Sequence, residues 1–174
     1  MVKNILAGLL LTLMSSMALG QQFIDIDDSK VSFEVANMKF NTVEGTFTGM
    51  KGTIEFDPTN LANARMNVCL DASSVDTGNK KRDEHLRKED FFDVANYPAI
   101  CFELTSVVNA TEGYTATGTL TMHGVTKEVN IPFTFSANTF QGTLSIDRMD
   151  YDIGSNGGFL VGRTVEMEIF CVVR

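Results

Sequence analysis

The chain has 174 residues and is acidic, with 22 Asp and Glu against 14 Lys and Arg and a formal net charge of −8. A surface of this sign repels phosphate backbones and anionic headgroups, so we expect neither nucleic acid nor a charged membrane surface as a partner. After the first twenty residues no apolar stretch approaches the roughly 18 residues of a membrane span, so we expect no stable membrane insertion.

The first twenty residues have the three parts of a secretory signal peptide. A short basic start over residues 1–4 precedes an apolar run over residues 5–17, and Ala18 and Gly20 supply small residues before the break. The apolar run is too short to span a bilayer, which disfavours the alternative of an uncleaved anchor. We expect a signal peptide over residues 1–20, one folded domain over residues 21–174, and a periplasmic or secreted location.

Strand periodicity runs through most of the remaining chain. Apolar and polar residues alternate, which places one face of each strand on a core and the other in water. Short turns containing Gly, Asn or Asp separate these runs. The pattern predicts eight strands, near residues 31–35, 52–56, 64–72, 100–104, 114–122, 127–135, 140–147 and 165–169. The chain is therefore all-β, and the pattern alone allows either a sandwich or a closed barrel.

One segment, residues 79–94, breaks this rhythm. Residues 79–89 are mostly charged helix formers with a cap available at Thr77, Gly78 or Asn79. Two phenylalanines follow, and Pro98 prevents a helix from continuing. We expect a short helical insertion, which serves either as a lid at the rim of the sheet or as a surface crossover that plugs one end.

The three cysteines differ in the face that alternation assigns to them. Cys69 and Cys101 fall on the same face of their strands as nearby polar residues, so both point outward from strands that can be adjacent. Cys171 falls on the same face of its strand as Val165 and Ile169 and points inward. In an exported chain we expect a Cys69–Cys101 disulfide and a buried free thiol at Cys171.

Catalytic and cofactor motifs are lacking. His85 and His123 are the only histidines, so a zinc site would need carboxylates or thiols as further ligands. The serines lack a Gly-x-Ser-x-Gly context, and the glycine-rich stretch over residues 154–158 lacks the Lys of a phosphate loop and indicates a mobile hairpin turn. We expect no enzyme activity, no metal and no cofactor.

Several motifs in sequence order resemble the YceI-like family. They begin with Gly45-Thr46-Phe47 and Ser74-Val75-Asp76-Thr77, and continue with Arg82-Asp83-Glu84-His85-Leu86, Asp90-Phe91-Phe92-Asp93-Val94 and Tyr97-Pro98. Residues 118–127 and 147–151 match the two later motifs of that family. The resemblance covers nearly all of the chain after the signal peptide.

The resemblance implies an eight-stranded antiparallel lipocalin-like barrel with an elongated apolar cavity. It also implies that the chain binds polyisoprenoids or other long-chain lipids, including isoprenoid quinones. One departure is Asp152, where the family commonly has Gly. A carboxylate there would change the preferred head group if the position faces the mouth of the cavity.

An eight-stranded barrel is just wide enough to be filled by side chains or to hold one slender ligand. Inward parity suggests contacts with an apolar tail for six residues: Phe47, Phe91, Phe92, Phe102, Phe135 and Ile146. For the rim and the head group the candidates are Arg82, Asp83, His85, His123, Arg148 and Asp150, each with an alternative role in a surface ion pair or a turn.

Two functions follow from these alternatives. The first is an exported protein that holds a long apolar lipid, a polyisoprenoid or an isoprenoid quinone, for transport, storage or sequestration. The second is a structural or interaction module of the cell envelope whose barrel is filled by its own side chains. A homodimer stays open in either case.

Overall fold

The structure is a computed structural model that describes residues 21–37, 41–154 and 161–174. The expected signal peptide and all but the first residue of the expected glycine-rich turn lie outside the described residues. The strands are β1 Gln22–Phe23, β2 Lys30–Asn37, β3 Asn41–Phe47, β4 Lys51–Glu55, β5 Arg65–Asp71, β6 Ala99–Asn109, β7 Tyr114–Met122, β8 Val125–Ser136, β9 Thr139–Asp147 and β10 Val161–Val172. The helical elements are η1 Leu61–Asn63, η2 Ala72–Ser74, α1 Lys80–Leu86 and η3 Arg148–Tyr151.

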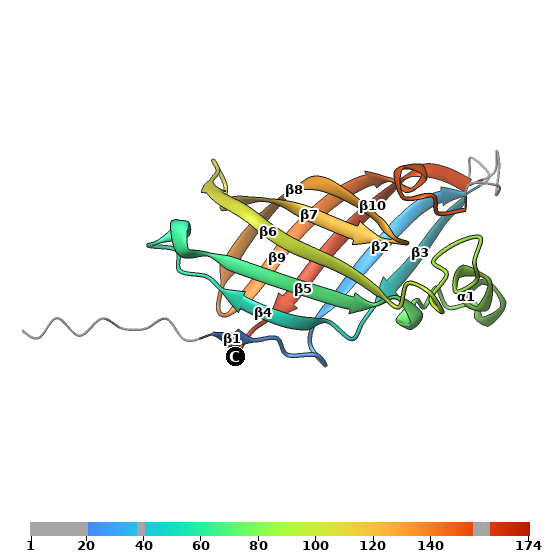
Figure 1. The fold of residues 1–174 in the computed structure, drawn as a ribbon, viewed down its shortest axis with the longest axis horizontal. Coiled ribbons are helices and arrows are strands. Elements are labelled where there is room, and N and C mark those ends of the chain that lie inside the picture. The colour runs from blue at the N-terminus through green and yellow to red at the C-terminus, as the bar shows by residue number, and fades with distance from the viewer. Residues whose placement is uncertain (1–20, 38–40, 155–160) are drawn as a thin grey trace, which may run out of the picture.

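These strands form one curled antiparallel sheet in the order β1-β4-β5-β6-β7-β8-β9-β10-β2-β3 (Figure 1). β2 pairs antiparallel with β10, and Ile24, the residue after β1, forms an antiparallel bridge with Val173, the residue after β10. β3 pairs with β2, and β4 pairs with β1 on one side and with β5 on the other. β1 and β2 are therefore two pieces of one interrupted strand, as are β3 and β4.

The pairings thus close a barrel of eight strands, as expected, when each interrupted strand is counted once. Two of the eight are interrupted, so the barrel contains ten strand segments. The sequence pattern missed β1, which has two residues, and β3, whose alternation is weakened by polar residues and by Gly45. Between β3 and β4 the chain bends at Gly49, with φ of 69°. That left-handed conformation suits glycine, and it lets the strand leave β2 and join β5.

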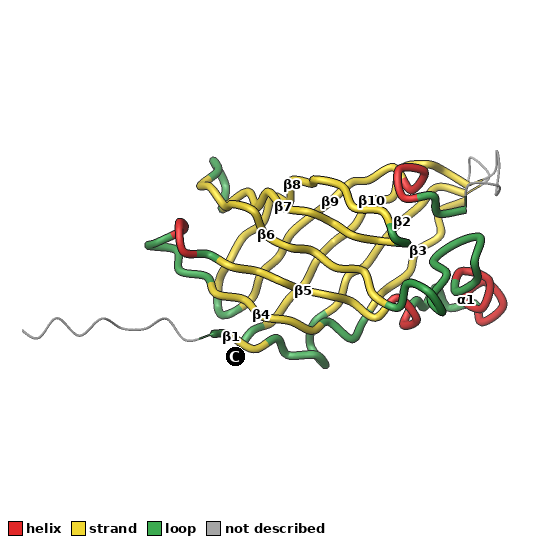
Figure 2. Tube along the Cα trace, viewed as in Figure 1, coloured by secondary structure: helices red, strands yellow, loops and turns green. Residues whose placement is uncertain are grey.

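Alternation decides which side chains enter the barrel. On β10, Val165, Met167 and Ile169 line the interior, whereas Glu166 and Glu168 lie on the outer face. In the tube view strands form the wall of the barrel, and the helical segments lie at its ends (Figure 2). No helix in the described residues is long and apolar enough to cross a membrane.

The helical insertion is present at one end of the barrel (Figure 1). Asn79 caps α1 by accepting a hydrogen bond from the backbone N–H of Arg82. The helix ends at Leu86, earlier than the expected 89, and the chain continues through turns to Pro98. Arg87 attaches the insertion to the barrel, because its guanidinium donates to the carbonyl oxygens of Ser73 and Val75 at 2.7 Å each.

The predicted disulfide between Cys69 and Cys101 is confirmed. The two residues are direct partners on β5 and β6, with Cα atoms 4.1 Å apart, and neither lines the interior. Cys171 is the buried free thiol that parity predicted. Burial raises the pKa of its thiol to about 11 from a reference value of 9.0, with a smaller opposing effect from a hydrogen bond with Ser29.

Candidate functional site

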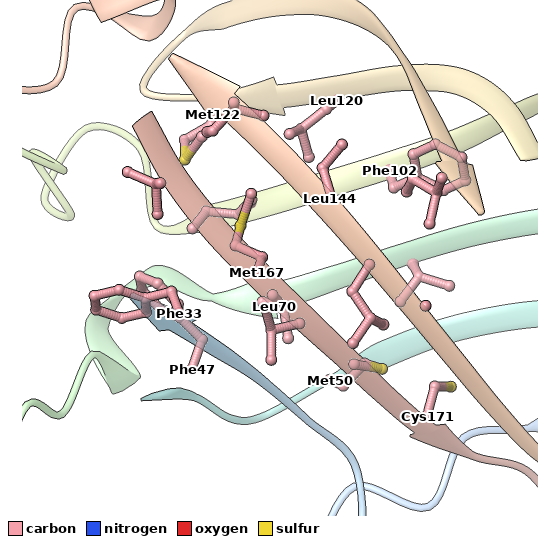
Figure 3. Close-up of a pocket in the computed structure, with 18 of the residues that line it drawn as sticks. Phe33, Phe47, Met50, Leu70, Phe102, Leu120, Met122, Leu144, Met167 and Cys171 are labelled. Atoms are coloured by element: carbon pink, nitrogen blue, oxygen red, sulfur yellow. The ribbon is translucent and has the colours of Figure 1, made fainter. Parts of the chain in front are cut away.

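An apolar cavity of about 220 Å³ lies inside the barrel. Its walls come from the inward faces of β2 to β10 and from the insertion that contains α1. Apart from Arg148, Gly142 and Cys171, every lining residue is aliphatic, aromatic or methionine (Figure 3). Such a lining offers water almost no hydrogen bonds, so the space favours an apolar occupant.

Five of the six predicted tail contacts line this cavity. Phe47, Phe102 and Ile146 reach it from β3, β6 and β9, and Phe91 and Phe92 reach it from the insertion after α1. The prediction for Phe135 is wrong. Its parity on β8 is correct, but it lies beyond the end of the cavity, where its ring centre is 4.4 Å from that of Phe140.

Other lining residues were not named from the sequence although the same signal pointed to them. Phe33, Leu144 and Met167 occupy inward positions of strands that alternation identified (Figure 3). Phe33 also explains why the first family motif, Gly45-Thr46-Phe47, begins with glycine. A Cβ atom built on Gly45 would lie 2.4 Å from Cζ of Phe33, so the missing side chain makes room for this ring on the wall.

Arg148 is the one rim candidate that lines the cavity, and it is only 6% exposed. Its guanidinium donates to the carbonyl oxygens of Gly162 at 2.9 Å, Ile153 at 2.6 Å, Gly154 at 2.9 Å and Val161 at 3.2 Å. It forms no ion pair with any described residue. Carbonyl dipoles therefore compensate a buried positive charge at the wall of an otherwise apolar space.

The nearest acidic neighbour in the chain is engaged elsewhere. The Asp147 carboxylate lies 2.7 Å from the guanidinium of Arg163 on the outer face. The hydrogen bond from Arg163 lowers the pKa of Asp147, with a further contribution from the backbone of Met149. Asp147 therefore forms its ion pair with Arg163 and not with Arg148.

Arg82 and Asp83 have structural roles. The Asp83 side chain is buried and accepts hydrogen bonds from the backbone N–H of Thr77, at 2.9 Å, and from the Thr77 hydroxyl. Nε of Arg82 donates to the same hydroxyl at 2.7 Å. These contacts hold α1 against the segment before it, and neither side chain lines the cavity.

The remaining rim candidates also lie outside the cavity lining. Nε2 of His85 is 2.8 Å from a carboxylate oxygen of Asp90, and both side chains are largely exposed. Nδ1 of His123 is 3.0 Å from the carbonyl oxygen of Tyr151, and Asp150 is 3.9 Å from Nζ of Lys127. The alternative role in a surface ion pair or a turn fits these residues.

Asp152 does not face the cavity. It is exposed at the C-terminal end of η3 and has a left-handed backbone, with φ of 55°. This conformation is the physical reason a glycine suits the position. Its effect on a head group, expected if it lay at the mouth of the cavity, has no support in this placement.

The cavity differs at its two ends. The end near α1 has Arg148, Leu86, Phe91 and Phe92 on its wall. The opposite end, toward the β8–β9 hairpin, is filled by a cluster of aromatic rings from Phe56, Tyr114, Phe133, Phe135 and Phe140. Within the described residues there is no group of three His, Cys, Asp or Glu placed to hold a metal ion.

Comparison with known proteins finds relatives along the whole domain. The YceI-like domain matches residues 23–173. A UPF0312 protein of Vibrio parahaemolyticus is 31% identical over 176 residues, which cover 91% of this chain and 92% of that protein. Protein YceI of Escherichia coli is 40% identical over 101 residues, which cover 58% of this chain and 53% of that protein.

Solved structures share the fold. BcnA of Burkholderia cenocepacia has a TM-score of 0.80 at 28% identity, covering 87% of this chain and 99% of that chain. A polyisoprenoid binding domain from Saccharophagus degradans has a TM-score of 0.67, covering 88% and 97% of the two chains. At 17% identity the second likeness concerns the fold alone.

Proposed function

Because the chain belongs to the YceI-like family, as its motifs indicated, and encloses an apolar cavity, we propose that it holds one long apolar lipid inside the barrel. Polyisoprenoids and isoprenoid quinones are the lipid classes that we favour. The cavity is the observation that carries this proposal, because the alternative of a structural module requires an interior filled by side chains. The solved polyisoprenoid binding domain with the same fold supports the choice of ligand class.

The apolar lining supplies affinity, and the Arg148 end supplies selectivity. Burying each methylene contributes about 0.8 kcal/mol, so burying about ten to fifteen tail carbons has a gross transfer energy of about 8 to 12 kcal/mol. Ordering the chain absorbs part of this energy, and the tail alone binds well. A guanidinium has five N–H groups, and four of them donate to carbonyls of the described residues, so the fifth can donate to an oxygen of the ligand.

The proposal includes export and a binding role without chemistry. The signal-like pattern of residues 1–20 supports a periplasmic or secreted protein, and the outer-face disulfide suits an oxidising compartment. Transport, storage or sequestration of the lipid are the roles open to such a protein. We propose no catalytic step, cofactor or metal.

The first test is native mass spectrometry of the mature protein purified from its own periplasm, followed by organic extraction and identification of the bound molecule. We expect one long-chain lipid per protein. Protein that arrives empty, and stays empty when offered isoprenoid quinones and prenols, would contradict the proposal and favour the interaction module.

A matched pair of tryptophan variants tests where the ligand lies. The chain has no Trp, so one introduced indole is the sole source of tryptophan fluorescence. Leu144 on β9 lines the cavity, and its neighbour Thr143 is exposed on the outer face. Added lipid should shift the emission of the Leu144→Trp protein and leave that of Thr143→Trp unchanged. Equal responses of the two proteins would place binding outside the cavity.

A further inference from the structure

We propose that the five aromatic residues opposite α1 form a floor that limits the length of the lipid tail. This aromatic floor consists of Phe56, Tyr114, Phe133, Phe135 and Phe140. The inference rests on the proposed function, since a floor limits nothing unless a tail occupies the cavity.

Phe56 is the centre of the floor. Its ring centre lies 5.1 Å from that of Tyr114, 5.6 Å from Phe133, 5.2 Å from Phe135 and 5.4 Å from Phe140. All four contacts are edge-to-face, an arrangement that aromatic rings favour at such distances. The rings come from β7, β8, β9 and the residue after β4, so they meet across the interior of the barrel.

The cavity ends on this cluster. Phe133 and Phe140 line it, whereas Phe56, Tyr114 and Phe135 do not line it and each packs against one or both of those rings. On β8 the boundary therefore falls between Phe133 and Phe135. Side chains that are packed edge to face in strand positions have little room to move aside for a longer tail.

The aromatic floor therefore sets the length of the cavity. Along β9 the cavity wall runs from Phe140 to Ile146, or about 20 Å at about 3.4 Å per residue. Strand tilt of about 40° shortens that path to about 15 Å along the barrel axis. A tail that reaches the floor must fold back or emerge at the α1 end when it is longer than the space.

The opposite end is built to hold the polar group. Arg148, the one charged residue among the described residues of the wall, lies there, and the rings of Phe91 and Phe92 come from an insertion and not from the barrel strands. A lipid therefore enters tail first, with its end against the floor and its head near Arg148. A tail longer than the distance from the floor to Arg148 then places the head group away from the guanidinium.

Two substitutions move the floor in opposite directions. Phe140→Ala removes a ring that touches three other members of the floor and extends the cavity. Ala116→Phe adds a ring one inward position above Tyr114 on β7, at a buried residue that lines the cavity, and shortens it. Phe92→Ala is the matched control, because it removes a lining ring near α1 and leaves the floor intact.

The experiment measures occupancy by native mass spectrometry with a series of all-trans prenols that differ by one isoprene unit, delivered from detergent micelles. Wild-type protein should show a length beyond which occupancy falls. Phe140→Ala should move that limit to longer prenols, because each newly buried methylene multiplies affinity about fourfold. Ala116→Phe should move it to shorter ones, and Phe92→Ala should weaken all lengths without moving it.

Circular dichroism and melting curves identify which variants are folded, and either floor variant alone carries the test. A length limit that is the same in a folded floor variant as in wild-type protein would overturn the floor and leave the proposed function standing. Occupancy that does not depend on length in wild-type protein would do the same. If wild-type protein binds neither a prenol nor an isoprenoid quinone, the proposed function is wrong and the floor, which rests on it, is overturned as well.

Discussion

Replacing Cys69 and Cys101 by alanine removes a cross-link that spans 32 residues of chain. In the chain-entropy account, closing a loop of that length stabilises the folded state by about 4 kcal/mol, because it restricts the unfolded chain. For a domain of this size a loss of 4 kcal/mol lowers the melting temperature by about 10 °C. The closed loop contains α1 and the lining residues Phe91 and Phe92, so we expect the insertion to loosen as well.

Urea unfolding of the oxidised wild-type protein and of the double variant measures this difference. Adding a dithiol reductant should lower the stability of the wild-type protein to that of the double variant and leave the variant unchanged, which separates the bridge from other effects of the substitutions. Proteolysis within residues 78–97 gives a second measurement and should be faster without the bridge. An unfolding free energy of the double variant within about 1 kcal/mol of the wild-type value would refute the loop-entropy reasoning.

Three further predictions concern single residues. Arg148→Met should lower the free energy of unfolding by about 3 kcal/mol or more, because four carbonyl oxygens lose their donor. Arg148→Lys should recover only part of this free energy, since an ammonium group lacks the planar fork of a guanidinium. Chemical denaturation measures the stability of both variants. Asp152→Gly should raise stability by about 1 kcal/mol by removing a left-handed non-glycine residue, whereas Asp150→Gly, within η3, should lower it; a gain for both would contradict the reasoning. The raised pKa of Cys171 should make its alkylation about 100-fold slower at pH 8 than that of an ordinary thiol. The same raised pKa stabilises the folded protein fully below about pH 9 and less as pH rises through about 11, so the urea midpoint of wild-type protein should fall relative to that of Cys171→Ala over this range.

Alternation alone determined which way most side chains face. It assigned Cys69 and Cys101 to the outer face and Cys171 to the interior, and the disulfide and the buried thiol agree. The two missed segments show its limit. β1 is too short to alternate, and β3 contains Asn41, Glu44 and Gly45, so neither has a pattern strong enough to identify.

Position along the barrel axis was beyond the sequence pattern. Phe133 and Phe135 have the same parity on β8, yet the first lines the cavity and the second lies behind it. Parity has a period of two residues and carries no information about where a cavity ends. That boundary depends on strand tilt and on which rings from other strands meet at the same level.

The polar candidates could not be ranked from the sequence for a related reason. Arg82 and Arg148 both lie in family motifs, but one binds Thr77 on the surface and the other enters the cavity wall. Their difference comes from carbonyl groups that the fold brings to Arg148 from residues 153–154 and 161–162. A local motif names the residue type and not the groups that will surround it.

The sequence by itself determined the all-β class, the short insertion between β5 and β6, and the side of the sheet on which most residues lie. These features follow from local periodicity and from turn residues, which act over a few positions of the chain. Only the tertiary structure decided that the barrel is hollow, that Arg148 alone among the rim candidates reaches the cavity, and that aromatic rings close the opposite end. Those outcomes depend on how side chains from strands far apart in the chain pack in one interior volume. A local sequence pattern carries no information about that packing.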